Sequence, residues 1–269
     1  MNTVLDERYV ERSSWLALGL EVIDAGRGGR ISDPVQVTVD DPPFVGRVPR
    51  HDSCLHALVY SPDVSSPVTI RILSPDRHFV PRKLQIPIGS EADAIDGVLP
   101  AASRTWRPLL FPGAAYDVSA SATGVRGRVV WADDGSPVRF ARVVASYGPQ
   151  RIGLAHGDDR GEFLLVLGVD TVDGDDYVLA DPPVMPPSLE VMLMIVAPND
   201  RPSPAAEDSL WGLPLEVAAG PGVTPDAVSL GEQLPDTYRN PGRVLVQSVT
   251  VPLGRITSVA AVPFEIPYP

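Results

Sequence analysis

The stretch that decides the fold is Val125-Arg-Gly-Arg-Val-Val-Trp-Ala-Asp-Asp-Gly-Ser-Pro-Val-Arg-Phe-Ala-Arg-Val143. Two apolar segments flank the central Asp-Asp-Gly-Ser-Pro, in which glycine reaches positive φ without steric cost and proline presets the backbone for a turn. A second turn, Asp158-Asp-Arg-Gly161, leads directly into the apolar segment 162–167. Short apolar segments separated by tight turns are typical of consecutive antiparallel strands.

The rest of the chain repeats this pattern. The 269 residues include 30 prolines and 23 glycines, which leave few windows long enough for an uninterrupted helix. Strand-like segments such as Val35-Gln-Val-Thr-Val39 alternate with turn residues at a spacing of about 8 to 12 residues, as in β-sandwiches. The sequence therefore predicts an all-β protein with two tandem immunoglobulin- or transthyretin-like β-sandwich domains.

The predicted domain boundaries lie where the runs of strand-like segments end. Residues 1–90 form an N-terminal sandwich, in which the segment 79–88 is expected at a sheet edge because it contains Pro81 and Pro87. Residues 91–121 form an apolar linker that should pack across both domains. Residues 122–262 form the second sandwich, including a long proline-rich loop at 198–243, and residues 263–269 form an extended tail.

The quoted stretch resembles the carboxypeptidase regulatory-like domain, a transthyretin-like sandwich. That family combines a G-x-V strand, a D-x-x-G-x-P-V turn, an A-x-V strand and a D-x-x-G-x-F turn that leads into a buried strand. Residues 15–88 look like a diverged copy. The resemblance implies a fold and carries no chemistry. The matching positions are Gly127, Val129, Asp133 or Asp134, Gly135, Pro137, Val138, Ala141, Val143, Asp158 or Asp159, Gly161 and Phe163.

The tandem arrangement and the linker Leu109-Leu-Phe-Pro-Gly-Ala-Ala-Tyr-Asp117 resemble uncharacterised proteins of phage-tail-like contractile injection gene clusters. This resemblance implies a structural or accessory component of a contractile particle, placed in its cap, collar or baseplate. The particle would be assembled in the cytoplasm and could then be released from the cell. The first residues include acids and lack the apolar core of a signal peptide, which also predicts a cytoplasmic protein.

The sequence gives little support for catalysis. It contains no GxSxG nucleophile elbow and no glycine-rich phosphate loop, and its four histidines lack metal-ligand spacing. His156 is expected in a salt-linked loop with the following aspartates, and the single cysteine, Cys54, is expected to be buried and inert. We therefore expect no catalytic residue, no cofactor and no metal. The acidic cluster Asp170, Asp173, Asp175 and Asp176 leaves cation binding open.

Charge and hydropathy exclude two classes of partner. The net charge of −12 argues against binding driven by phosphate neutralisation, so no nucleic acid is expected. No segment approaches the ~18 apolar residues of a membrane helix, so no membrane span is expected.

The expected function is that of a non-enzymatic subunit of a multiprotein assembly, which binds other subunits and forms a homo-oligomer. Stiff proline segments and strand edges suit protein docking. The predicted interface residues are Phe264, Ile266 and Tyr268 in the tail and Trp211 in the proline-rich loop. The sequence leaves open whether the tail packs on its own chain or on another. The alternative function is a ligand- or glycan-binding β-sandwich module, in which exposed tryptophans would line the site.

Overall fold

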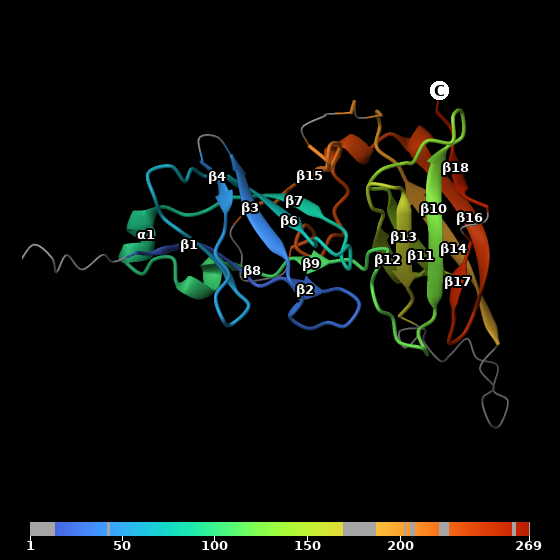
Figure 1. Cartoon of the computed structure of the whole chain (residues 1–269), viewed down its shortest axis with the longest axis horizontal. Coiled ribbons are helices and arrows are strands. Elements are labelled where there is room, and N and C mark those ends of the chain that lie inside the picture. The colour runs from blue at the N-terminus through green and yellow to red at the C-terminus, as the bar shows by residue number, and fades with distance from the viewer. Residues whose placement is uncertain are drawn as a thin grey trace, which may run out of the picture.

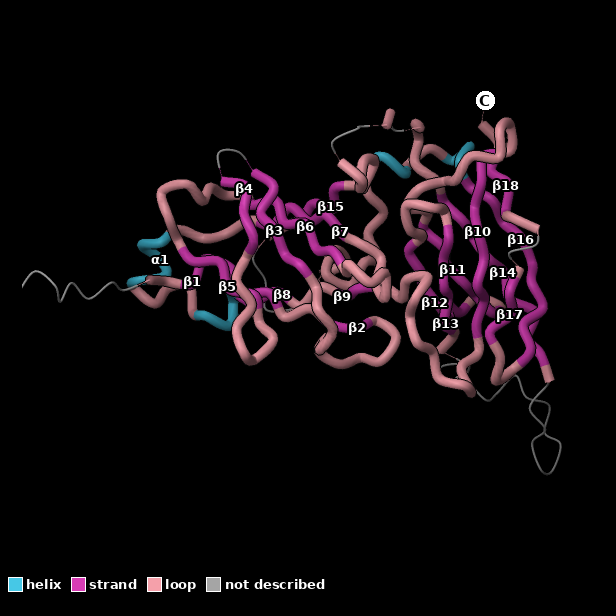
Figure 2. The backbone as a smooth tube through the Cα atoms, in the orientation of Figure 1, coloured by secondary structure: helices cyan, strands magenta, loops and turns pink. Residues whose placement is uncertain are grey.

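The computed structural model describes residues 14–41, 44–168, 187–201, 203–204, 208–220, 226–259 and 262–268. Strands account for 42% of the structure and helices for 6%, which confirms the all-β prediction. The strands form several sheets, and the few helices are short (Figure 2).

The first half of the chain supplies four strands of a five-stranded sheet, and the fifth, β15 (Leu215–Val217), comes from the proline-rich segment. The order of this sheet is β15-β7-β6-β3-β4, and a smaller sheet has the order β5-β1-β8. In β6, Val68, Ile70 and Ile72 all point into the core and are at most 1% exposed, as the period of two in the sequence requires. The bounds are β1 Leu16–Leu20, β2 Ile23–Asp24, β3 Gln36–Asp41, β4 Phe44–Arg47, β5 His56–Val59, β6 Val68–Leu73, β7 Arg82–Ile86, α1 Glu91–Ile95, η1 Ala101–Arg104, β8 Thr105–Trp106 and β9 Leu109–Leu110.

The second half forms two facing sheets. One contains β13-β10-β17, with β18 also paired to β10, and the other has the order β12-β11-β14-β16. Gly127 of β10 stands opposite Phe163 of β13 in the same sheet, and a Cβ there would sit 2.7 Å from the Phe163 ring. The bounds are β10 Gly124–Trp131, β11 Arg142–Tyr147, β12 Gln150–His156, β13 Glu162–Val166, β14 Ser188–Val196, β15 Leu215–Val217, η4 Asp236–Tyr238, η5 Pro241–Arg243, β16 Val244–Pro252, β17 Ile256–Ser258 and β18 Phe264–Ile266.

The proline-rich segment 198–243 crosses from the second half to the first. Its strand β15 pairs parallel with β7, and Glu216 stands opposite Leu84 (Figure 1). The prediction that 79–88 forms a sheet edge was wrong. β7 begins after Pro81 and ends before Pro87, so neither proline interrupts the ladder and β15 can occupy the position beside it.

The segment 91–121 packs on both halves. Its strands β8 and β9 pair with β1 and β2, while Phe111 stacks on His156 of β12 with ring centroids 3.9 Å apart. The buried apolar side chains form two clusters, one in each half, but Leu164, Ala218 and Val228 belong to the cluster of the first half. The division into two domains at 90 and 121 stays a prediction.

The tail is extended, and in this structure it pairs with its own chain. Val129 and Trp131 of β10 stand opposite Phe264 and Ile266 of β18 in a parallel ladder.

Cys54 departs from the expectation of a buried thiol. It lies in the turn before β5 at a φ of 65° and is half-buried.

Candidate functional site

Trp211 lines an open groove of about 470 Å³ near the end of β10 and the start of the proline-rich segment. The groove presents aromatic, proline and arginine side chains together. Its lining residues are Trp131, Ser136, Pro137, Arg139, Pro198, Arg201, Ser203, Pro204 and Trp211.

Arg139 fixes one wall of the groove. Its guanidinium lies 3.9 Å from the ring centroid of Trp211 and donates hydrogen bonds to the carbonyl oxygens of Trp211, Asp159 and Ser209 at 3.0–3.1 Å. Burial lowers the pKa of Arg139, although nearby carboxylates of Asp159 and Asp158 oppose the shift. Arg139 therefore holds the segment around Ser209 and Trp211 in place, and its guanidinium N–H groups are already hydrogen-bonded to backbone carbonyl oxygens.

The C-terminal tail closes the neighbouring wall. The ring of Tyr268 lies 4.3 Å from both the Arg201 and the Arg243 guanidinium groups, and Trp131 meets it edge-on with centroids 5.3 Å apart. Arg243 donates to the carbonyl oxygen of Pro267 at 2.9 Å. Arg201 also forms ion pairs with Asp133 and Asp134 of the turn after β10. Cations on aromatic faces attach the end of the tail to its own sandwich.

The four predicted interface residues fall into two groups. Phe264 and Ile266 are buried in the chain's own core, at 3% and 0% exposure. Tyr268 is 37% exposed and contacts two lining residues of the groove, while Trp211 is half-buried in its wall. That any of these side chains contacts another subunit stays a prediction.

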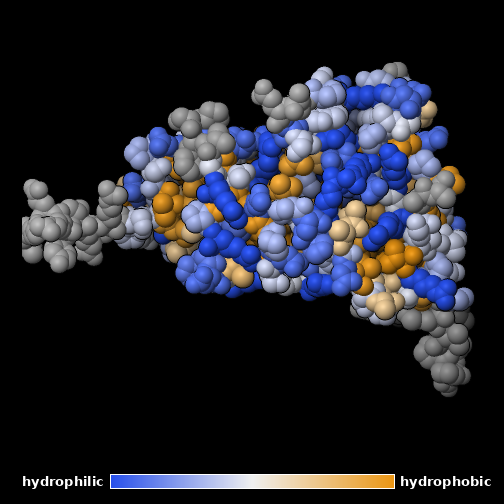
Figure 3. Space-filling model, in the orientation of Figure 1, coloured by the Kyte–Doolittle hydropathy of each residue, from blue (hydrophilic) through white to orange (hydrophobic). Residues whose placement is uncertain are grey.

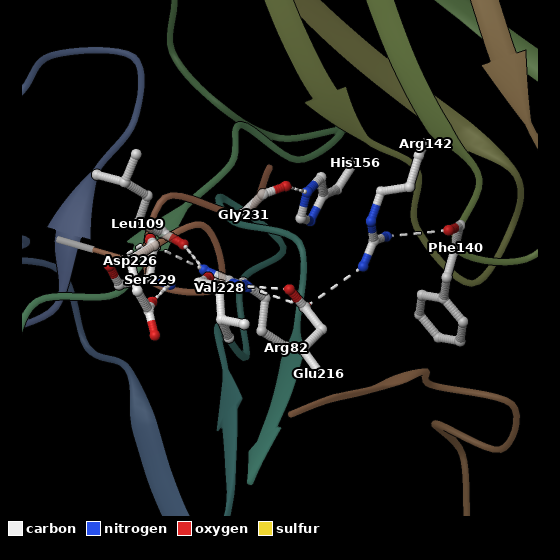
Figure 4. A network of polar contacts seen from close by, with 10 residues as sticks. All are labelled: Arg82, Leu109, Phe140, Arg142, His156, Glu216, Asp226, Val228, Ser229 and Gly231. Atoms are coloured by element: carbon white, nitrogen blue, oxygen red, sulfur yellow. Dashed lines mark hydrogen bonds and ion pairs between the residues drawn. The ribbon is translucent and has the colours of Figure 1, made fainter. Parts of the chain in front are cut away.

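A buried network lies where the two halves meet (Figure 4). The Arg82 and Glu216 side chains are at most 1% exposed and form an ion pair at 2.6 Å, and Arg142 of β11 reaches the other Glu216 oxygen at 3.3 Å. Arg82 also donates to the carbonyl oxygens of Leu109 and Ser229 at 2.7 and 3.2 Å, and to that of Val228. We call Arg82, Glu216 and Arg142 the ion-pair lock.

His156 lies next to the lock, and the expected salt link to an aspartate was wrong. Its Nε2 is 3.0 Å from the carbonyl oxygen of Gly231, which fixes Nε2–H as the donor. Complete burial, together with the charges of Arg142 and Arg82, holds the pKa of His156 well below its usual range. The ring is neutral and stacked on Phe111, and none of the described residues brings a carboxylate into contact with it.

The aspartates instead pair with the first half of the chain. Asp158 accepts hydrogen bonds from the backbone N–H groups of Arg160 and Glu162 at 2.8 and 2.9 Å, and burial raises its pKa. Arg77, before β7, contacts Asp159 at 2.9 Å and Asp158 at 3.5 Å. These contacts form a second connection between the halves.

Sequence reasoning missed the ion-pair lock. Its charged members are separated by up to 134 positions along the chain. One local signal was present: Glu216 is the only charged residue in the apolar triplet Leu215-Glu-Val217. A buried charge is retained only when it is paired, but the sequence does not show with what.

Within the residues that the structure describes, no three His, Cys, Asp or Glu side chains lie close enough to hold a metal ion. The acidic cluster at 170–176 lies outside those residues. In the same part of the chain, no helix has the length and apolar composition needed to cross a membrane.

Compared with protein families, curated proteins and solved structures, the chain has no significant match in any of the three.

Proposed function

We propose that this chain is a non-enzymatic structural subunit that joins other proteins in a large assembly. The observation that carries the proposal is the ion-pair lock. The fully buried charged groups at the centre of the molecule bind one another and the backbone, and they connect β7, β11 and β15. Such groups fix the geometry of the segments that they connect.

The junction between the halves favours a rigid connector. The strand β15, the Phe111–His156 stack and the ion pairs of Arg77 join the two parts at separate points. A buried ion pair adds little to stability over an apolar alternative, but it specifies how the parts fit. A subunit that spaces or aligns its neighbours needs such a fixed relation.

The particle we propose is a phage-tail-like contractile injection system, with this chain in the cap, collar or baseplate. The support is the resemblance of the paired strand-and-turn pattern and of the linker 109–117 to proteins of such gene clusters. The partners would be other protein subunits, and assembly would take place in the cytoplasm.

The test is to co-express the tagged full chain with its neighbouring genes and to identify the proteins that copurify. We expect tube, sheath or baseplate proteins in stoichiometric amounts. A control chain carrying Glu216→Ala should capture less, because the relation between the halves is lost. Recovery of the chain alone, with neighbouring gene products soluble in the same lysate, contradicts the proposal.

The groove at Trp211 supports a second candidate function, binding of a glycan or another ligand. Two tryptophans and two arginines border it, and aromatic faces bind sugars and extended peptides. Binding on a glycan array that disappears in Trp211→Ala, and survives in a variant at the distant exposed residue Trp15, supports this function.

A further inference from the structure

The strand β16 is an open edge of the second half. It lies at the end of the sheet β12-β11-β14-β16, and in the described part of the chain its one ladder partner is β14, over nine register pairs from Ser188↔Pro252 to Val196↔Val244. Among the described residues, one row of its backbone N–H and C=O groups therefore faces away from β14 with no strand in a ladder with it. Such a row is a template for another strand.

This edge lacks the usual protection. Its sequence, Val-Leu-Val-Gln-Ser-Val-Thr-Val-Pro, contains no charged residue in a chain with a net charge of −12. The opposite edge, β12, carries Arg151, which pairs with Glu232, and the edge strand β4 carries Arg47. Proteins keep edges single with charges, prolines, bulges or short strands, and β16 is a nine-residue strand without a charge whose one proline, Pro252, stands at its end.

We propose that β16 pairs antiparallel with β16 of a second copy of this chain, about a two-fold axis at Ser248. This inference rests on the proposed role as an assembly subunit and names the surface that joins two copies. The pairing merges two four-stranded sheets into one continuous sheet across the dimer. It is an isologous contact, so it closes at two copies.

The side chains of β16 suit this axis. Ser248 meets itself, Val246 meets Thr250, and Leu245 meets Val251, so each outward residue faces an outward residue and each inward residue an inward one. β-branched and aliphatic pairs of this kind stabilise antiparallel strands. No pair places like charges opposite each other.

The face beside the axis is also apolar. Met192 and Met194 of β14 are 44% and 38% exposed, and they stand opposite Ser248 and Val246, the latter 59% exposed. On this face, Glu190 accepts a hydrogen bond from Ser248 at 2.8 Å. Because three strand spacings separate the two Glu190 strands, these carboxylates are at least about 14 Å apart, beyond the Debye length of ~8 Å at physiological salt. The dimer should therefore strengthen as salt is raised from low to physiological concentration.

The first measurement is sedimentation and light scattering of the purified full chain over a range of concentrations. We expect a reversible monomer–dimer equilibrium. Ser248→Lys places two ammonium groups opposite each other and weakens the dimer about tenfold or more. Ser258→Lys, at an exposed serine of β17, makes the same change of charge and leaves the dimer intact. Unchanged far-ultraviolet circular dichroism and melting temperature verify that both variants fold.

The second measurement tests the register by crosslinking. In a Cys54→Ser background, Ser248→Cys places two thiols directly opposite each other, with Cβ atoms about 4.5–5.5 Å apart, and a short bifunctional reagent links them. Val246→Cys is the matched control: its two thiols are offset by four residues, about 13 Å along the strands, and remain unlinked.

Three outcomes overturn the inference: a chain that is monomeric at every concentration, Ser248→Lys that leaves the dimer unchanged, or Val246→Cys that links as well as Ser248→Cys. A monomeric chain whose capture of another subunit fails in Ser248→Lys assigns the edge to that subunit. That result overturns pairing with a second copy and leaves the proposed function standing. A dimer that captures no other subunit contradicts the proposed function and leaves the pairing intact.

Discussion

At the scale of single residues, the decisive feature is how the buried charges of this chain are paired. Glu216 lies between two buried arginines, and nearby carbonyl oxygens accept from both, Leu109 among them for Arg82 and Phe140 for Arg142. Removing the carboxylate leaves two guanidinium groups in the interior without a counter-charge. Removing all three charges together leaves an apolar interior that can repack.

We therefore expect Glu216→Ala to destabilise the fold by about 3–5 kcal/mol, the cost of breaking a buried ion pair. The matched control is Glu232→Ala, which removes the exposed pair with Arg151 and costs about 1 kcal/mol or less. Urea unfolding of both variants measures the two free energies. Equal losses of unfolding free energy in the two variants would contradict a special cost of breaking the buried pair. The triple variant Arg82→Met, Glu216→Leu, Arg142→Met removes all three charges and should recover most of the stability.

His156 should make the stability of the chain depend on pH. Its pKa is lowered in the folded state, so below the ordinary histidine pKa of about 6.5 the unfolded chain binds a proton that the folded chain does not. Stability from this residue is fully present above that pH and is lost as the pH falls below it. His156→Phe keeps the stack on Phe111 and should flatten the fall in melting temperature between pH 7.5 and 5. His51→Phe, at an exposed histidine, is the control and should leave the fall unchanged.

At the scale of elements, strand β18 decides what the tail does. Phe264 packs against Phe163 with ring centroids 5.8 Å apart, and Ile266 is fully buried. The tail thus completes the core of the second half, beside the parallel ladder to β10. Tyr268 lies further along the tail. The guanidinium groups of Arg201 and Arg243 lie over its ring, and the side chain is 37% exposed.

Truncation of these side chains should follow their burial. We expect Phe264→Ala to cost about 3–5 kcal/mol, as is typical for a buried aromatic residue, and Tyr268→Ala to cost much less. Thermal melts of the two variants test the difference. A Phe264→Ala variant as stable as the parent would mean that the tail leaves its own core in solution.

The sequence predicted the alternating strands well, because a half-buried strand shows its period of two locally. β3 and β6 were visible in this way, the region of β14 was visible as a continuous apolar run of strand length, and glycine and proline marked the turns between β10 and β13. β15 was not visible, since three residues in a proline-rich segment show no period. The sequence also left the direction of the tail open, because proline restricts the backbone and says nothing about which surface it meets.

For the candidate site, the sequence identified residues of the right chemical type but did not show which residues they contact in the fold. Trp211 and Tyr268 were expected at a surface; Trp211 lines the groove, and Tyr268 contacts two of its lining residues, Trp131 and Arg201. Phe264 and Ile266 have the same apolar character but lie in the core, and a sequence of seven residues does not separate these cases. The partners of Arg82 lie on segments far along the chain, so only the folded structure brings them together.

At the scale of the whole molecule, the halves are coupled through buried contacts. The molecule is elongated along the direction that joins them, and β15 runs beside β7 in the half opposite to its neighbours in sequence (Figure 1). Hydrophilic residues cover much of the surface in one view, with apolar patches between them on both parts (Figure 3). The coupling runs through the lock, the stack on Phe111, strand β15 and the ion pairs of Arg77.

Unfolding should report this coupling. We expect calorimetry of the parent chain to show one cooperative transition, because the sheet of the first half includes β15 from the proline-rich segment and buried contacts join the two halves. Glu216→Ala should split it into two transitions, since β15 loses its buried anchor. Two separate transitions in the parent would contradict a coupled molecule.

The place of β15 also sets the order in which the protein is made. The ribosome adds about 5 to 20 residues per second, so several seconds pass between the synthesis of β7 and that of β15. During that interval the nascent N-terminal half presents an incomplete sheet with a bare border, and Arg82 still lacks its counter-ion. Biogenesis is therefore the stage at which this chain is most exposed to mispairing, and a chaperone that shields the border of β7 would act before translation ends.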